Sequence, residues 1–332
     1  MDNQGSLMSN DMPDDAVTVD GMTARQAIDR IETAGRPRPH DRRLHARGAV
    51  YDARFVPTGH VAGLTRATHL TTETEAVIRF SNGSPKIDAD DRIKGIRGMA
   101  VKFLSDGRAV ADLVAANFRV FPSNTPEGFI DLVEAMAAAS AADGTLADRA
   151  KSKIAAVGKI AGVLAHHPES RAGLKTFIAR QPPASFATCR YDGLHAFFLV
   201  DAEGHRRAFR YRLVPQLGEI ELEAAHASTL TPDFLLGELD ARLNAGPVSF
   251  TLVFQLAEEG DPTNDPSIAW PEHRPLLPAG YLHVQRRSAR NDEWERHVFD
   301  PTRVAPGVEL SEDPVLRFRP HAYSVSAERR ST

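Results

Sequence analysis

The chain has 332 residues, 42% of them hydrophobic and 25% charged, which is the composition of a folded globular protein. Its 40 Lys and Arg residues and 44 Asp and Glu residues give a net charge of -4, so we expect neither a nucleic acid nor an anionic membrane as a partner. The single cysteine, Cys189, excludes an internal disulfide and any multi-cysteine metal site. A reducing, cytoplasmic compartment fits this cysteine content.

The first residues of the chain are polar and acidic. They lack the basic and apolar regions of a secretory signal, and no stretch approaches the roughly 18 consecutive apolar residues of a membrane span. We therefore expect residues 1–22 to be a flexible lead-in and residues 23–332 to form a single domain. We find no internal repeat and no marked domain boundary within it.

The first half of the chain changes from strand patterns to helix patterns. Residues 23–35 predict a helix with Thr23 as N-cap and Gly35 as its stop. Four strands are expected next and three helices after them, the first of these helices with Thr125 as N-cap and Pro126 at its first position. The strands are expected at 46–57, 75–83, 97–107 and 111–121, and the helices at 125–140, 145–167 and 169–181.

In the second half, strand patterns return. Strands are expected at 185–193, 194–204, 206–215, 220–224, 247–260 and 281–287, with a helix at 233–246 and a long loop at 261–280. The last pattern, 311–330, predicts a helix with Ser311 as N-cap, in which Pro320 requires a kink or a late start. This order is typical of an α+β fold in which two runs of strands close one antiparallel, eight-stranded β-barrel around an enclosed site, with inserted and C-terminal helices.

Several long motifs occur together in this sequence. They are RRLHARGAVYDARF, VIRFSNGSP, DLVAANFRVF, WPEHRPLLPAGYLHVQRR and FDPTRVAPGVELSEDPVLRFRPHAYS. In this order, over roughly residues 37–330, they resemble the monofunctional haem catalase superfamily, and specifically its short, catalase-related peroxidase branch. The resemblance implies one haem b inside the antiparallel barrel. We expect the domain to lack the C-terminal extensions of larger members.

On one side of the haem, the resemblance makes Tyr323 the iron ligand. A free tyrosine has a pKa near ~10, so a neighbouring positive charge must help to hold it deprotonated. Arg319 lies one helical turn earlier on the same face and carries that charge. In the family this arginine continues through an aspartate and a histidine as a hydrogen-bonded chain, and Asp313 and His195 occupy those positions here.

On the other side, the resemblance makes His45 the residue that takes a proton from one peroxide oxygen and delivers it to the other. Ser81 falls on the serine that orients this imidazole. An ungapped comparison places Ala116 on the family's distal asparagine, whereas a shift of one residue brings Asn117 into the site. We name Asn117 as a candidate catalytic residue and leave the register open.

The remaining cofactor-binding candidates are arginines and aromatic residues. Arg42, Arg79 and Arg330 match the arginines that pair with the haem propionates, since a guanidinium suits a carboxylate. Phe129 matches an aromatic residue that lies against the haem plane, and Phe121 belongs to the same set.

Three departures from the family pattern concern the distal pocket. Gly83 replaces the valine that narrows the family's peroxide channel, Ala116 replaces the asparagine, and Pro122 replaces a second aromatic residue. We expect each change to make the pocket roomier or less polar, which favours peroxidase activity over efficient dismutation of hydrogen peroxide.

The resemblance thus predicts a haem-dependent hydroperoxidase. It reduces hydrogen peroxide or an organic hydroperoxide through a ferryl intermediate, and a second peroxide or a small organic electron donor closes the cycle. One alternative is a hydroperoxide-rearranging enzyme similar to allene oxide synthases, or another specialised oxidative haem enzyme. Another is a non-catalytic haem-binding protein, against which the retention of His45 argues. A homodimer is an open expectation.

Overall fold

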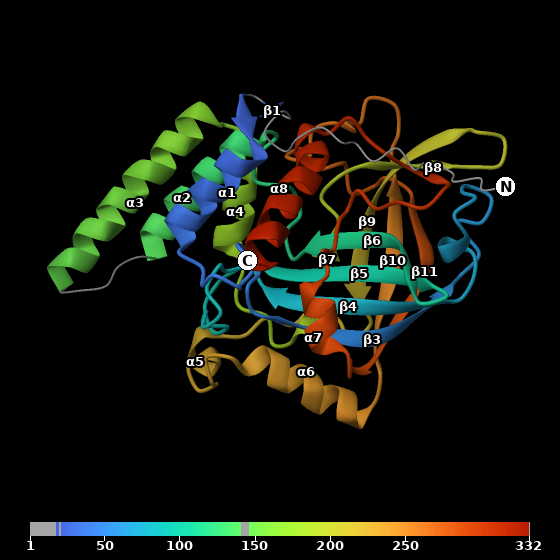
Figure 1. The fold of residues 1–332 in the computed structure, drawn as a ribbon, viewed down its shortest axis with the longest axis horizontal. Coiled ribbons are helices and arrows are strands. Elements are labelled where there is room, and N and C mark those ends of the chain that lie inside the picture. The colour runs from blue at the N-terminus through green and yellow to red at the C-terminus, as the bar shows by residue number, and fades with distance from the viewer. Residues whose placement is uncertain (1–17, 20, 141–145, 332) are drawn as a thin grey trace.

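A closed antiparallel barrel forms the centre of the molecule (Figure 1). The computed structural model describes residues 18–19, 21–140 and 146–331. Eight strands pair in the ring order β10-β11-β3-β4-β5-β6-β7-β9, and β9 closes the ring by pairing with β10. Their bounds are β3 Gly48–Pro57, β4 Thr74–Asn82, β5 Arg97–Ser105, β6 Arg108–Ala116, β7 Tyr191–Asp192, β9 Arg206–Pro215, β10 Val248–Leu256 and β11 Leu276–Arg287. The predicted α+β barrel is confirmed.

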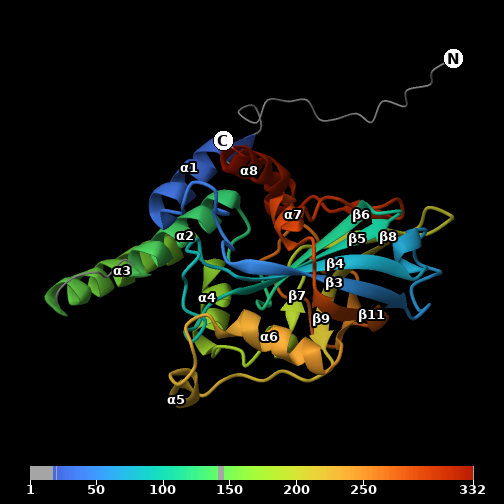
Figure 2. The same cartoon turned by 60° about the horizontal axis from the view of Figure 1, so that its bottom comes forward.

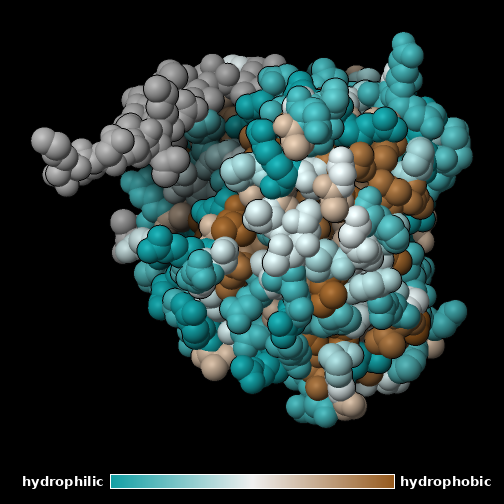
Figure 3. All heavy atoms as spheres, turned by 90° about the vertical axis from the view of Figure 1, so that its right-hand side faces the viewer, coloured by the Kyte–Doolittle hydropathy of each residue, from teal (hydrophilic) through white to brown (hydrophobic). Residues whose placement is uncertain are grey.

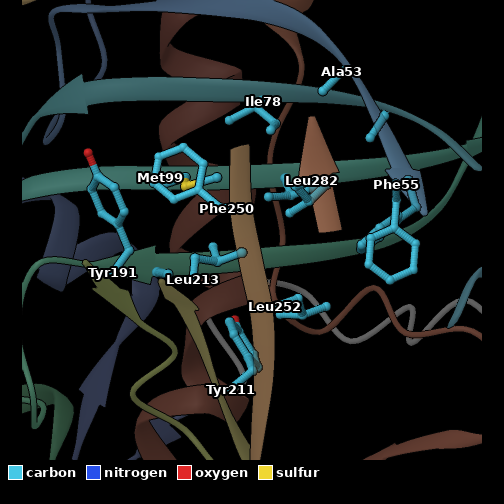
Figure 4. Packing of buried hydrophobic residues seen from close by; sticks show 14 of the residues in the cluster. Ala53, Phe55, Ile78, Met99, Tyr191, Tyr211, Leu213, Phe250, Leu252 and Leu282 are labelled. Carbon is cyan, nitrogen blue, oxygen red and sulfur yellow. The ribbon is translucent and has the colours of Figure 1, made fainter. Parts of the chain in front are cut away.

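The interior of the barrel is a solid apolar core. Alternate residues of each strand point inward, and large side chains such as Phe55, Met99, Tyr191 and Phe250 meet there fully buried (Figure 4). The rings of Phe80 and Phe250 lie 6.0 Å apart, centre to centre. These side chains fill the interior, so the candidate residues described below lie on the outer face of the barrel wall and in the helices beside it.

Helices gather on one side of the barrel (Figures 1 and 2). They are α1 Ala24–Gly35, α2 Pro126–Ser140, α3 Leu146–His166, α4 Ser170–Ala179 and α8 Pro314–Ser331. Ile28 and Ile31 of α1, Ile130 of α2 and Phe318 and Val325 of α8 form a second buried cluster, which joins these three helices. The helix α6 Phe234–Ala245 packs against η2 Phe186–Thr188 and β11, and the helix α7 Asn291–Arg296 packs against β3.

The caps of the predicted helices were partly as expected. Thr23 caps α1 and shares a reciprocal pair of hydrogen bonds with Gln26. The last helix differs, because its N-cap is Asp313 and not Ser311: Asp313 Oδ1 accepts hydrogen bonds from the backbone N–H groups of Val315 (2.9 Å) and Leu316 (3.1 Å). The helix begins at Pro314, so Pro320 lies inside it and does not delay its start.

Other segments also differ from the sequence predictions. Residues 185–193 form η2 and the two-residue strand β7 in place of a full strand, and residues 220–224 make only an isolated bridge from Glu221 to Pro183. The expected loop 261–280 is shorter, because β11 already begins at Leu276. The sequence also missed α7 and the short strand β12 Val308–Leu310, which pairs with β8 Phe197–Val200.

The predicted lead-in, residues 1–22, lies mostly outside the described residues. Its described part contains strand: β1 Thr18–Val19 pairs with β2 Met22–Thr23, and the Met22 side chain is buried against α1. In the described part of the chain, no helix is both long and apolar enough to cross a membrane. On the face turned away from α3, apolar residues form separate areas among hydrophilic ones (Figure 3).

An ion pair on the outer face of the barrel connects it to the segment before α8. Lys102 of β5 and Asp112 of β6 are both fully buried, with Nζ–Oδ distances of 2.8 and 2.6 Å. Lys102 also donates to Val298 O (3.1 Å), and Asp112 accepts from the backbone N–H of Asp300 (2.8 Å). The pair therefore attaches residues 298–300 to the barrel wall.

We predict that Lys102→Met destabilises the protein by about 3–5 kcal/mol, because it leaves the Asp112 carboxylate buried without its partner. Chemical denaturation measures the free energy of unfolding. As a control, Arg286→Met removes an ion pair with Asp52 whose arginine is 78% exposed, and should cost at most about 1 kcal/mol. Equal losses of unfolding free energy in the two variants would show that the buried ion pair stabilises the protein no more than the exposed one.

Candidate active site

The candidate site begins on the outer face of the barrel wall formed by β4, β5 and β6. The register pairs Ser81 with Gly98, and Gly98 with Ala116. Residues directly opposite each other share a face of the sheet, and the neighbours Phe80 and Met99 point into the core. The row Ser81–Gly98–Ala116 therefore faces outward. Two of its three members have almost no side chain.

His45 lies on this row, just before β3. Its backbone φ of 56° is unusual for a residue other than glycine, and its N–H donates to Gly83 O (3.3 Å). The imidazole Nδ1 lies 2.9 Å from Ser81 Oγ. A Cβ atom on Gly98 would lie 2.8 Å from the imidazole Nδ1 and Cε1 atoms and from Ser81 Oγ, so only glycine leaves room for this pair.

The surroundings of His45 keep its imidazole neutral. Burial lowers the pKa of His45 to about 3, and the positive charges of Arg79 and Arg319 add to the effect. In the tautomer whose Nδ1–H donates to Ser81 Oγ, Nε2 is the nitrogen free to take up a proton. The pair can therefore act as a general base at neutral pH, as the sequence analysis expects for His45 and Ser81.

Two arginines pair with a single carboxylate beside His45, and Arg330 adds a third positive charge near them. Arg79 Nε lies 2.9 and 3.0 Å from the two carboxylate oxygens of Glu295, and Arg42 Nε lies 3.5 Å from one of them. Burial, and after it repulsion from Arg79, lowers the pKa of Arg42 to about 9. The same two causes lower the pKa of Arg330. Arg42 Nε is buried without a hydrogen-bond partner among the described residues. This excess of positive charge suits further anionic groups.

An unbroken hydrogen-bonded chain crosses from the barrel to α8. Arg319 directs two N–H groups at the Tyr323 hydroxyl oxygen, the Nε contact being 2.9 Å. Its Nη1 donates to His195 Nε2 (3.0 Å), so the proton of His195 lies on Nδ1, which donates to Asp313 Oδ2 (2.7 Å). Burial lowers the pKa of His195, although Asp313 opposes the effect. The structure thus brings together the four residues that the resemblance placed in one chain.

Two aromatic candidates lie next to this chain. The rings of Phe121 and Phe129 are 4.9 Å apart, and Phe121 lies 5.5 Å from the imidazole of His195. Phe129 also packs against the cluster that joins α1 and α8. These rings therefore line the junction between the barrel end and the helices.

Asn117 and Ala116 lie on different parts of the wall. Ala116 belongs to the outward row beside His45. Asn117 follows the end of β6, is buried, and uses its Oδ1 to accept a hydrogen bond from the backbone N–H of Arg97 (2.7 Å). The carboxamide oxygen therefore holds the start of β5. The catalytic role of Asn117 stays a prediction.

Gly83 does not widen the pocket as the sequence suggested. A Cβ atom on Gly83 would lie 2.9 Å from Ile96 Cβ and 3.0 Å from Ile96 O. The space that a valine side chain would enter is already filled, so the expectation of a roomier wall at Gly83 is wrong. Pro122, the other aliphatic departure, packs against Gly173 of α4.

The sequence analysis missed two residues of this site. Gly98 follows Arg97 in the expected strand 97–107, but nothing in the sequence shows that its missing side chain makes room for His45; the sheet register does. Glu295 was missed because α7 was missed, and its contact with Arg79 joins residues 216 positions apart. The sequence of a short, polar segment does not indicate that one of its glutamates will pair with buried arginines.

Fold and site define an α+β barrel protein with a neutral histidine–serine pair on the barrel wall and a tyrosine-bearing helix beside it. The family model described as Catalase matches residues 2–332. A catalase-related peroxidase of Mycolicibacterium paratuberculosis is 40% identical over 94% of this chain and 96% of its own length. A catalase-related peroxidase of Synechococcus elongatus is 29% identical over 94% and 89%, and Catalase-2 of Bacillus subtilis is 28% identical over 86% and 43%.

The chain belongs to the catalase family, as the motifs indicated. It is therefore an oxidoreductase that acts on peroxide.

We predict that Gly98→Ala lowers the rate of peroxide decomposition by about 10²–10⁴-fold, because the added methyl group displaces the imidazole that serves as acid and base. Oxygen release and peroxide absorbance measure the rate. Gly237→Ala, at a helical position with open space around it, is the control and should leave the rate unchanged. A Gly98→Ala protein with the native rate would show that the space left by Gly98 is not needed to position the His45 imidazole.

Proposed function

We propose that the protein is a haem-dependent hydroperoxidase that reduces hydrogen peroxide or an organic hydroperoxide. The observation that carries this proposal is the continuous chain Asp313–His195–Arg319–Tyr323, which directs two N–H groups of a guanidinium at one phenol oxygen. Such an arrangement stabilises negative charge on that oxygen, and an anionic tyrosine oxygen is a ligand for ferric iron.

The described residues fit a haem group. Tyr323 would hold the iron, and Arg42, Arg79 and Arg330 would hold the two propionates. The single Glu295 carboxylate among several arginines and the depressed pKa of Arg42 support this assignment, since a further carboxylate would offset the excess positive charge. When bound, haem supplies the redox chemistry that no side chain of this site offers. Phe121 and Phe129 are proposed to pack against it, next to His195.

His45 and Ser81 would transfer and position a proton in the reaction. His45 takes the proton of the hydroperoxide O–H at Nε2 and delivers it to the leaving oxygen, which departs as water or an alcohol. Ser81 holds the other imidazole nitrogen, so the ring keeps one orientation throughout. Since the pKa of His45 is lowered to about 3, the base is not lost to protonation at mildly acidic pH. The organic donor that closes the cycle stays a prediction.

The site also supports the proposal that residues 23–332 act as a single domain. Its residues begin at Arg42 and end at Arg330, and α1 packs directly against α8.

Rearrangement of an organic hydroperoxide is the second candidate function. It is favoured by Ala116, whose methyl group stands in the row beside His45 where the family resemblance expects an amide. A site without that amide offers one hydrogen bond less to a small peroxide. Product analysis with a fatty-acid hydroperoxide separates the two functions: an alcohol indicates reduction, and an isomeric or dehydrated product indicates rearrangement.

We predict that Tyr323→Phe abolishes the visible spectrum of ferric tyrosinate haem and most peroxide activity, because no other phenol oxygen receives the two Arg319 hydrogen bonds. Absorption spectra of haem-loaded protein test this. Tyr281→Phe changes a tyrosine that is 37% exposed on β11 and serves as the control. An unchanged spectrum in Tyr323→Phe would place the ligand elsewhere.

We further predict that His45→Ala keeps haem bound while peroxide reduction slows by about 10²–10⁴-fold, the usual effect of losing a general acid–base. Tyr323 and the three arginines remain, so the spectrum of the resting protein should persist. Stopped-flow mixing with peroxide measures the rate. His226→Ala, an exposed histidine of α5 Ala224–Ala227, is the control. Native kinetics in His45→Ala would exclude it from the reaction.

A further inference from the structure

The wall beside His45 continues one row beyond Ser81 and Gly98. The Gly83 N–H donates to Ile96 O (2.8 Å), which extends the pairing of β4 and β5 past their last regular pair. Because side chains alternate along a strand, Gly83 and Ile96 share the outer face with Ser81 and Gly98. The side chain of Ile96 is therefore on the same face as the His45 imidazole.

Ile96 is the bulky side chain of this row next to Gly83. Its Cβ and Cγ2 atoms would lie 2.9 and 3.3 Å from a Cβ on Gly83, so it covers the glycine. It packs in one apolar cluster with Phe121 and Ala116. Gly83 in turn accepts the hydrogen bond from the His45 N–H (3.3 Å), so Ile96 lies across a single glycine from the catalytic histidine.

The segment that carries Ile96 is held rigidly. The guanidinium of Arg97 is fully buried and donates to the carbonyl oxygens of Asp91 (3.0 Å), Ile93 (3.2 Å) and Ile96 (3.1 Å). Asn117 Oδ1 binds the backbone N–H of the same arginine. The backbone at Ile96 is therefore fixed from two sides, and its side chain can act as a steric filter.

We propose that Ile96 is a specificity-determining residue of the His45 site, whose side chain limits the bulk of the hydroperoxides and ligands that reach the imidazole. The inference rests on the proposed function. A branched aliphatic group without donors or acceptors discriminates by size alone. Hydrogen peroxide passes it, and hydroperoxides with a bulky carbon next to the peroxide group are held back.

The test compares a small and a bulky ligand of ferric haem in the haem-loaded protein, namely cyanide and 4-phenylimidazole. Ile96→Ala should raise the association rate of 4-phenylimidazole at least about tenfold and leave cyanide nearly unchanged, since even one methylene in an apolar pocket changes discrimination by about tenfold or more. Visible absorption records both rates. The ratio of cumene hydroperoxide to hydrogen peroxide turnover should rise in parallel.

Ile93→Ala is the matched control, because Ile93 lies in the same segment but is 60% exposed. It should leave both rates as in the native protein. Ile96→Val, which removes one methyl group, should shift the bulky ligand in the same direction by a smaller factor, and replaces Ile96→Ala if that variant fails to fold. Equal association rates of 4-phenylimidazole in the native, Ile96→Val and Ile96→Ala proteins overturn the proposed role of Ile96 and leave the proposed function untouched. A native protein that binds no haem overturns the proposed function and this inference together.

Discussion

The Asp313 carboxylate joins the fold of this protein to its candidate site. One carboxylate oxygen accepts hydrogen bonds from the first free backbone N–H groups of α8 and so caps the helix. The other oxygen accepts a hydrogen bond from Nδ1–H of His195. The helix that Asp313 starts carries Arg319 and Tyr323, so a single buried group sets both the direction of the helix and the orientation of the residues that the site needs. Loss of this carboxylate would affect helix, histidine and tyrosine together.

The solid barrel core decides where chemistry can take place. Large aromatic and aliphatic side chains fill the interior, so polar side chains with a function are confined to the outer face and to the helices that cover it. Room on that face comes from missing side chains: Gly98 leaves space for the imidazole, and Gly48 leaves space for the Arg79 guanidinium, 2.7 Å from where its Cβ would be. The inner face of the barrel wall thus forms the apolar core, and the outer face carries the polar candidate residues.

Gly83 and Ile96 show why a single position is a poor measure of pocket size. Compared with the family pattern, Gly83 alone suggests an open channel, but its cross-strand partner fills the same volume. A bulky side chain on the neighbouring strand can fill the volume that a glycine leaves open. Sequence comparison at one position therefore misses a compensation that the sheet register makes evident.

The sequence by itself determined most of the barrel strands, the helical block and, through the family motifs, the residues of the tyrosine chain, because alternating apolar residues, caps and long ordered motifs are local signals. It did not determine the cap of α8, since Ser311 and Asp313 are both good capping residues and only the position of His195 favours the aspartate. Only the tertiary structure decided that the His45–Ser81 pair lies on the outer face of the barrel wall, that Glu295 joins the arginines and that Ile96 covers Gly83, because each depends on which segments become neighbours.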